Sequence, residues 1–158
     1  MPSLRALLPT EKYTVLDFDS RGVPDGADHS WRQSESRYWL EEGTRTSADG
    51  KELIVCGFVK PADFNEITDE STPVVRIIVL DADGETIRKR LIGRYTKDGM
   101  FDETQKVIGK PINEFIESNV WYSTKMREES LADGLPVIDT SSFTPEQVAS
   151  KVVDLINN

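Results

Sequence analysis

One stretch constrains the fold of this chain more than any other. It comprises residues 74–95, VVRIIVLDADGETIRKRLIGRY. The stretch opens with an apolar run that only Arg76 interrupts, and then turns through Asp81-Ala82-Asp83-Gly84. Beyond the turn, Ile87, Leu91 and Tyr95 recur every four residues, which predicts an amphipathic helix. A buried strand that leads into a cationic helix is an arrangement suited to holding phosphates.

The helix predicted in this stretch is strongly basic in an otherwise acidic chain. The formal net charge is -9, yet residues 86–97 contain no acidic residue and five basic ones, namely Arg88, Lys89, Arg90, Arg94 and Lys97. Arg90 and Arg94 share one helical face, where like charges cost roughly 0.2–0.5 kcal/mol that a bound anion would offset. The spacing is compatible with an anion site or with a solvated face paired with nearby acids.

Composition favours one soluble domain that spans residues 1–158. The length suits a single core, and no apolar run approaches the roughly 18–20 residues that span a bilayer. The acidic balance argues against nucleic-acid and membrane-surface binding. The first residues, MPSLRALLPTEK, do not resemble a signal peptide, and the single Cys56 excludes an intramolecular disulfide. These features predict a cytoplasmic protein.

Short apolar segments alternate with helical patterns along the chain. Strands are expected at residues 13–19, 53–59, 74–82 and 135–140, and the second should be buried on both faces. Helices are expected at residues 3–8, 30–42, 60–67, 84–95 and 111–131 and after residue 144. Residues 96–104 are expected to form a polar lid or loop. The order predicts an α/β domain with a mainly parallel sheet, whose ligands bind beyond the carboxyl ends of the strands. All four of these ends are polar.

Two of these predicted elements carry candidate site residues. The first strand ends in Asp17 and Asp19, which either meet a metal, a hydroxyl or a cation, or cap the next turn. The helix from Ser30, which Gly43 should stop, has an apolar face and also carries arginines. Its tryptophans are either core or a stacking surface for a planar substrate. The residues concerned are Trp31, Arg32, Arg37, Tyr38, Trp39 and Leu40.

In the order of its parts, the chain resembles the small-molecule kinases of the P-loop fold, such as adenylate, shikimate, gluconate and adenylylsulfate kinases. VLDFD is similar to the strand whose acids contact the phosphate acceptor, and LIVCGFVKP to the next strand with its loop. IIVLDADGETIRKRLIGRY is similar to the strand and helix that enter the lid. LPVIDTSSFTPEQVASKVVDLI is similar to the last strand, the adenine-side loop and the final helix.

The resemblance implies roles for particular residues. Asp17 or Asp19 would orient or deprotonate a hydroxyl acceptor, and Arg90 and Arg94 would stabilise charge on the transferred phosphoryl group. ATP with magnesium would be the cofactor, and the acceptor could be a nucleoside, a sugar acid or another small hydroxyl compound. The acceptor pocket would involve Trp31, Arg32, Arg37 and Lys60, and the nucleotide would contact Arg90, Arg94, Ser141 and Ser142.

One part of the family pattern is missing. These kinases cradle phosphates with G-x-x-x-x-G-K-[ST] after a first strand, and this sequence contains no such motif. Three explanations stay open: a truncated kinase or misassigned start, a degenerate relative that only binds, or another α/β enzyme or module. A non-catalytic module would bind an anion or a partner chain, and an unpaired sheet edge would favour a homodimer. No zinc site is expected, because His29 is the only histidine and Cys56 the only cysteine, and no residue is assigned as a metal ligand.

Overall fold

The structure is a computed structural model that describes residues 1–61, 64, 67, 74–95 and 109–158. It divides into two compact units, here called unit 1 (Met1–Ile77 with Pro145–Asn158) and unit 2 (Ile78–Thr144). Each unit contains one two-stranded parallel sheet. The described part of the chain is therefore mixed α/β with small parallel sheets, and none of its helices is long and apolar enough to cross a membrane.

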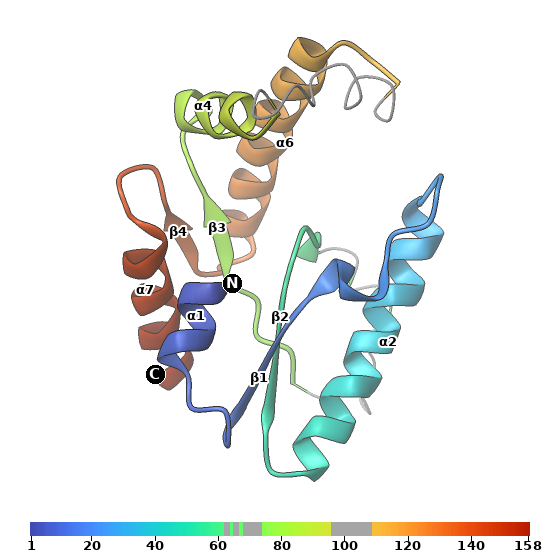
Figure 1. Cartoon of the computed structure of the whole chain (residues 1–158), viewed down its shortest axis with the longest axis vertical. Coiled ribbons are helices and arrows are strands. Elements are labelled where there is room, and N and C mark those ends of the chain that lie inside the picture. The colour runs from blue at the N-terminus through green and yellow to red at the C-terminus, as the bar shows by residue number, and fades with distance from the viewer. Residues whose placement is uncertain (62–63, 65–66, 68–73, 96–108) are drawn as a thin grey trace. The chain divides into compact units, whose positions relative to one another are not determined.

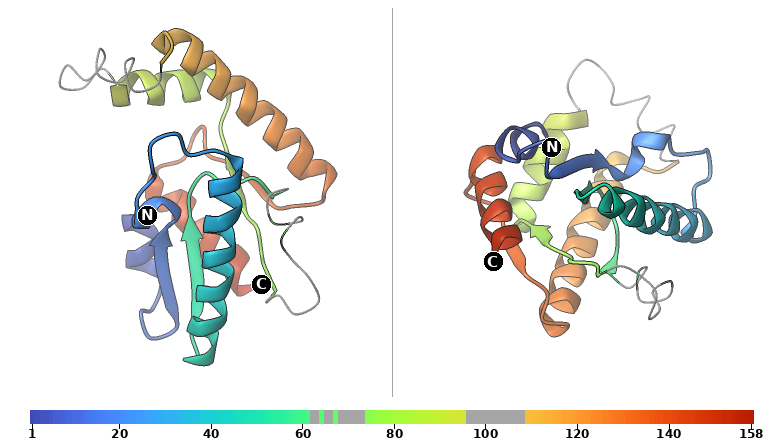
Figure 2. Two further views of the ribbon diagram at one scale, coloured as in Figure 1. Left: turned by 90° about the vertical axis from the view of Figure 1, so that its right-hand side faces the viewer. Right: turned by 90° about the horizontal axis from the view of Figure 1, so that it is seen from below.

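The sheet of unit 1 pairs β1 (Tyr13–Asp17) with β2 (Glu52–Cys56). The strands are joined by helix α2 (His29–Ala48), which runs alongside β2 (Figures 1 and 2). Tyr13 and Val15 are buried, whereas no residue of β2 is fully buried. Residues on both faces of β2 are half-buried, so the strand is less covered than the sequence predicts.

The first strand ends two residues earlier than the sequence predicts. A short 3-10 helix, η1 (Phe18–Arg21), follows Asp17 directly. The Asp17 carboxylate accepts a hydrogen bond from the backbone N–H of Asp19 at 3.0 Å and so caps this helix. The capping interpretation is confirmed for Asp17, and the strand is shortened because its terminal carboxylate binds a backbone donor of the turn.

Helix α2 differs from the predicted helix at both ends. Its N-cap is Asp28, whose carboxylate accepts from Trp31 N at 3.0 Å, and not Ser30. The helix continues through Gly43 and ends before Gly50, which has a positive φ of 73°. Gly50 is the residue that needs the left-handed conformation, and Gly43 is an ordinary helical glycine, so the predicted stop was wrong.

Two terminal helices complete unit 1. Helix α1 (Pro2–Leu7) packs against helix α7 (Pro145–Asn157), so the N- and C-termini lie on neighbouring helices (Figure 1). The Arg76 guanidinium donates to the carbonyls of Leu155 at 3.1 Å and Ile156 at 2.9 Å, in the last turn of α7. A cation here satisfies carbonyls that have no partner within the helix, which explains the charge inside the apolar run.

The sheet of unit 2 pairs β3 (Val79–Asp81) with β4 (Val137–Asp139), and Asp81 stands opposite Asp139. Helix α6 (Ile112–Ala132) packs on both strands, and helix α4 (Gly84–Tyr95) packs on α6 (Figure 1). The predictions for both helices are confirmed to within one residue. The predicted strand at residues 74–82 was too long, since Val74 is fully exposed and pairing begins at Val79. The predicted lid at residues 96–104 lies outside the described residues.

Candidate functional site

In unit 1, the register of the sheet brings the candidate acids beside the end of β2. Asp17 stands opposite Cys56, and a Cβ atom on Gly57 would overlap the Cβ of Phe18. The residues that follow β1 and β2 are therefore in contact, and position 57 has no room for a side chain. Asp17 is used by the backbone of η1, whereas Asp19 is exposed and its carboxylate forms no hydrogen bond or ion pair with another described residue. Asp19 is therefore the more accessible of the two acids.

Helix α2 holds the η1 turn from both ends. The Trp39 indole donates to the carbonyl of Phe18 at 3.2 Å. Arg21 forms an ion pair with Glu35 at 3.1 Å, and its guanidinium lies 3.6 Å from the centre of the Tyr38 ring. Glu35 is only 7% exposed, and its other carboxylate oxygen has no hydrogen-bond partner among the described residues. Sequence reasoning missed Glu35 and Arg21, although positions 35 and 39 share a face of α2.

The predicted substrate residues fall into two groups. Trp31 packs edge-to-face on Phe18, with ring centres 6.1 Å apart. Arg32 donates to the carbonyl of Phe58 at 3.1 Å. These two residues lie beside the η1 turn, whereas Arg37 is exposed and forms no hydrogen bond or ion pair with the described residues. Lys60 is half-buried two residues after Phe58.

In unit 2, the aspartates at the strand ends organise the fold. Asp81 is buried, accepts from the Ser123 hydroxyl at 2.7 Å and lies 3.6 Å from the guanidinium of Arg127. Asp83 caps α4 by accepting from the backbone and the hydroxyl of Thr86 at 2.7 and 2.9 Å. Because each carboxylate has local donors, these acids need no metal to satisfy them.

The two arginines of the predicted anion site differ in their surroundings. Arg90 donates to the hydroxyl of Thr140 at 2.8 Å and to its carbonyl at 2.7 Å, and Thr140 is buried. Arg94 lies one turn later, is exposed, and forms no hydrogen bond or ion pair with the described residues. Arg90 therefore fastens α4 to the end of β4, whereas Arg94 is accessible to an external anion.

The predicted nucleotide-side serines also differ. The Ser141 hydroxyl donates to the Asp139 carboxylate and accepts from the backbone N–H of Asp83 at 2.8 Å. It thus joins the loops that follow β3 and β4. Ser142 is exposed. One of the two serines is therefore used by the fold of unit 2.

The residues predicted to contact the nucleotide are partly engaged within unit 2. No three carboxylate, histidine or cysteine side chains among residues 1–61, 64, 67, 74–95 and 109–158 could hold a metal ion together. The sequence has no glycine-rich phosphate loop, and Arg90 and Ser141 already have partners within unit 2. On α4, Lys89 and Arg94 are exposed and could contact an anionic group.

The capping aspartates make the stability of unit 2 dependent on pH. The backbone N–H of Thr86 is the main cause that lowers the pKa of Asp83, and the Ser141 hydroxyl is the main cause that lowers the pKa of Asp139. A carboxyl with a depressed pKa in the folded state stabilises that state above the ordinary aspartate pKa of about 3.9. This contribution disappears as the pH falls through the lowered value.

We therefore expect acid to destabilise the wild type more than an asparagine variant at these positions. Urea unfolding of the wild type and of D83N/D139N, measured from pH 6 down to about pH 2.5, checks this. The difference in unfolding free energy between the two proteins should shrink as the pH falls. A constant difference would contradict the assignment.

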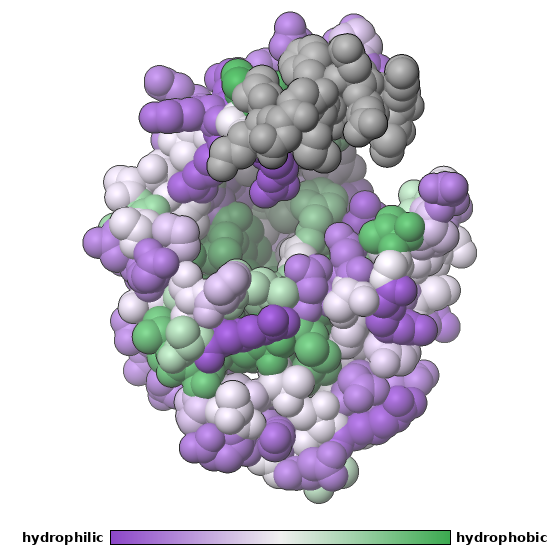
Figure 3. Space-filling view, viewed as in Figure 1, coloured by the Kyte–Doolittle hydropathy of each residue, from purple (hydrophilic) through white to green (hydrophobic). Residues whose placement is uncertain are grey.

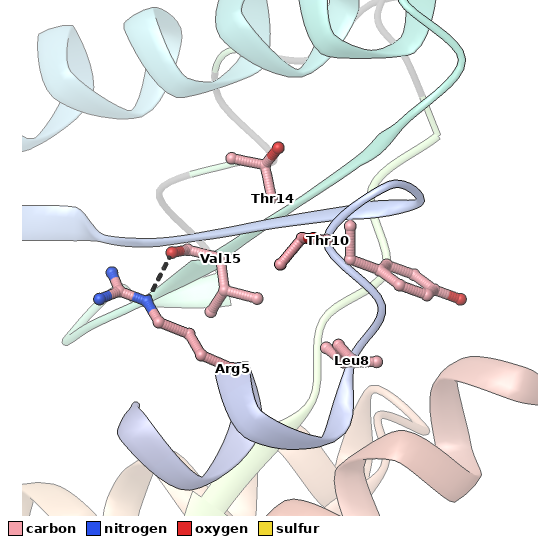
Figure 4. A pocket seen from close by; sticks show the side chains of 6 residues that line it. Arg5, Leu8, Thr10, Thr14 and Val15 are labelled. Carbon is pink, nitrogen blue, oxygen red and sulfur yellow. Dashed lines mark hydrogen bonds between the residues drawn. The ribbon is translucent and has the colours of Figure 1, made fainter.

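A hollow of about 290 Å³ lies along the unpaired edge of β1 and contains none of the predicted site residues. Its lining comes from α1, β1 and the turn between them, and Arg5 donates from α1 to the carbonyl of Val15 at 3.0 Å (Figure 4). Hydrophobic residues gather over α1 and β1 on the face drawn in Figure 3. Since Glu52 N donates to Lys12 O, Val15 belongs to the edge that faces away from β2, and Arg5 satisfies one acceptor of that edge.

Comparison with known proteins yields no relative. No protein-family model, no curated protein and no solved structure matches the chain.

Proposed function

We propose that this chain is a kinase-like phosphotransferase whose chemistry is phosphoryl transfer to a hydroxyl group of a small molecule. The proposed architecture is a three-layer domain like that of the P-loop kinases, without its first strand. The observation that supports the proposal is the environment of Arg94, an exposed guanidinium on the helix that directly follows β3. A helix that is anchored by Arg90 to Thr140 presents this cation at a defined position.

Phosphoryl transfer depends on positioning and on electrostatic stabilisation, so individual side chains can be assigned proposed roles. By the resemblance to the kinases, Asp19 on the η1 turn of unit 1 would accept the proton of a hydroxyl group. By the same resemblance, Arg94 of unit 2 would stabilise charge on a phosphoryl group. Arg90 would act as a positioning residue for α4. The sequence contains no phosphate loop for ATP, and we derive no step for the phosphoryl donor.

The test of the Arg94 assignment is anion binding. R94A should weaken binding of inorganic pyrophosphate about tenfold, because a charge-assisted contact to a phosphate contributes roughly 1.5–3 kcal/mol. Isothermal titration calorimetry on the full chain measures this affinity. R37A is a matched control, since Arg37 is also exposed and also forms no hydrogen bond or ion pair with the described residues. Equal pyrophosphate affinities in R94A and R37A would contradict the proposal.

A second candidate is a non-catalytic α/β module that binds an anion or a partner chain. It is favoured by the use of Arg90 and Ser141 within unit 2, because both were expected to contact the nucleotide. The unpaired edge of β1 would suit a homodimer, although Arg5 already occupies one of its acceptors. This candidate predicts concentration-dependent association and no thermal shift with Mg-ATP. A monomer that Mg-ATP stabilises would support the kinase instead.

A further inference from the structure

An exposed aromatic ring lies at the carboxyl end of the sheet in unit 1. Phe58 follows β2 by two residues and is 51% exposed. Its carbonyl accepts from Arg32, and the Arg32 guanidinium lies 5.3 Å from the centre of its ring. A cation at this distance contributes a cation–π interaction and favours a particular placement of the ring. Phe58 thus presents an exposed aromatic ring next to the Arg32 guanidinium.

The surroundings of Phe58 form a connected group, here called the aromatic platform, made of Phe18, Trp31, Arg32 and Phe58. Arg32 also lies near the Trp31 ring, with 6.0 Å between the guanidinium and the ring centre. Trp31 packs edge-to-face on Phe18, which is 1% exposed and anchors the group in the core. The platform therefore has a buried base and an exposed outer ring.

The platform adjoins the accessible acid of unit 1. Asp19 follows Phe18 directly, and Gly57, which precedes Phe58, packs against Phe18. A ligand that stacks on Phe58 would therefore lie at the same strand ends as the Asp19 carboxylate. A carboxylate beside an aromatic surface suits a ligand with a flat apolar face and a hydroxyl group at its edge.

From this juxtaposition we infer that unit 1 binds a planar aromatic or heteroaromatic compound that bears a hydroxyl group. The ring stacks on Phe58 beside the Arg32 guanidinium, and the hydroxyl donates to Asp19. A polyhydroxylated aliphatic acceptor, such as a sugar acid, offers no aromatic face that could stack on the Phe58 ring. The inference deepens the proposed function, because it names the acceptor class of that site.

Binding without any phosphoryl donor tests the inference. Adenosine, thymidine and pyridoxine serve as probes that bear an aromatic ring (ring-bearing probes), and ribose and gluconate as probes that bear none (ring-free probes). Calorimetry on the full chain should detect at least one ring-bearing probe and neither ring-free probe. Stacking contributes about 1–3 kcal/mol per ring in alanine substitutions, so F58A should weaken that binding about tenfold, whereas F58W should retain it.

W121A is a matched control, because Trp121 is also exposed but belongs to unit 2. It should leave the affinity unchanged, and circular dichroism should show all three variants folded. Ring-free probes that bind as well as ring-bearing ones, or an F58A affinity equal to wild type, would overturn the inference.

The outcomes separate the inference from the proposed function. Ring-bearing probes that bind through Phe58 without ever being phosphorylated would support the inference and contradict the kinase. Phosphorylation of gluconate with no effect of F58A would support the kinase and overturn the inference.

Discussion

Replacing Phe18 by alanine should lower the free energy of unfolding by about 3–5 kcal/mol, the usual loss for a buried phenylalanine. Phe18 is 1% exposed, forms an edge-to-face ring contact with Trp31, and packs on Gly57. Its removal leaves a cavity at the point where the ends of β1 and β2 meet. Urea denaturation followed by tryptophan fluorescence measures the loss.

Phe58 provides the matched control for this change. F58A removes the same atoms from a ring that is 51% exposed, so its effect on stability should stay below about 1 kcal/mol. F18L should fall between wild type and F18A, because leucine fills part of the cavity. Similar losses in F18A and F58A would contradict the placement of Phe18 at the centre of unit 1.

Replacing Arg90 by alanine should lower the free energy of unfolding by about 1.5–3 kcal/mol, the usual contribution of hydrogen bonds to charged groups. The change leaves the hydroxyl and carbonyl of buried Thr140 without their guanidinium donor. The same hydroxyl also donates to the carbonyl of Asp81 at 2.7 Å, so the junction between β3 and β4 should loosen. Denaturation together with hydrogen exchange at residues 79–81 measures this.

Anion affinity separates Arg90 from Arg94. R90A should keep most of its pyrophosphate affinity once the protein is folded, whereas R94A should lose affinity and keep its stability. R90K should be intermediate in stability, because lysine cannot bridge both oxygens with a planar fork. Loss of pyrophosphate binding in R90A without a change in stability would show that Arg90 binds the anion directly.

Local patterns were sufficient to predict helices α4 and α6. The apolar residues of α4 and α6 recur at helical spacing, and both helices lie within one residue of their predicted bounds. Strand lengths were overestimated at residues 13–19, 53–59, 74–82 and 135–140, because an apolar residue looks the same whether or not it pairs with another strand. The helix stop at Gly43 was wrong because glycine ends a helix only where the backbone turns left-handed.

The sequence predicted which residues belong to the candidate site, but it did not predict which of them bond within the fold. The sequence singled out Asp17 with Asp19, and Arg90 with Arg94, as pairs of like residues. In the structure, Asp17 and Arg90 form hydrogen bonds with their surroundings, whereas the Asp19 carboxylate and the Arg94 guanidinium form no hydrogen bond or ion pair with the described residues. Glu35, which pairs with Arg21 beneath the η1 turn, has no sequence motif because its partner is 14 residues away.

The sequence by itself determined the alternation of strands and helices, the basic helix in an acidic chain, and the absence of a phosphate loop. These features depend on side-chain periodicity, charge and glycine spacing, which are local. Only the tertiary structure decided that Arg90 forms hydrogen bonds with Thr140, and that Phe58 lies against Arg32 beside the η1 turn. These contacts join residues far apart in the chain, and no pattern along one segment specifies such partners.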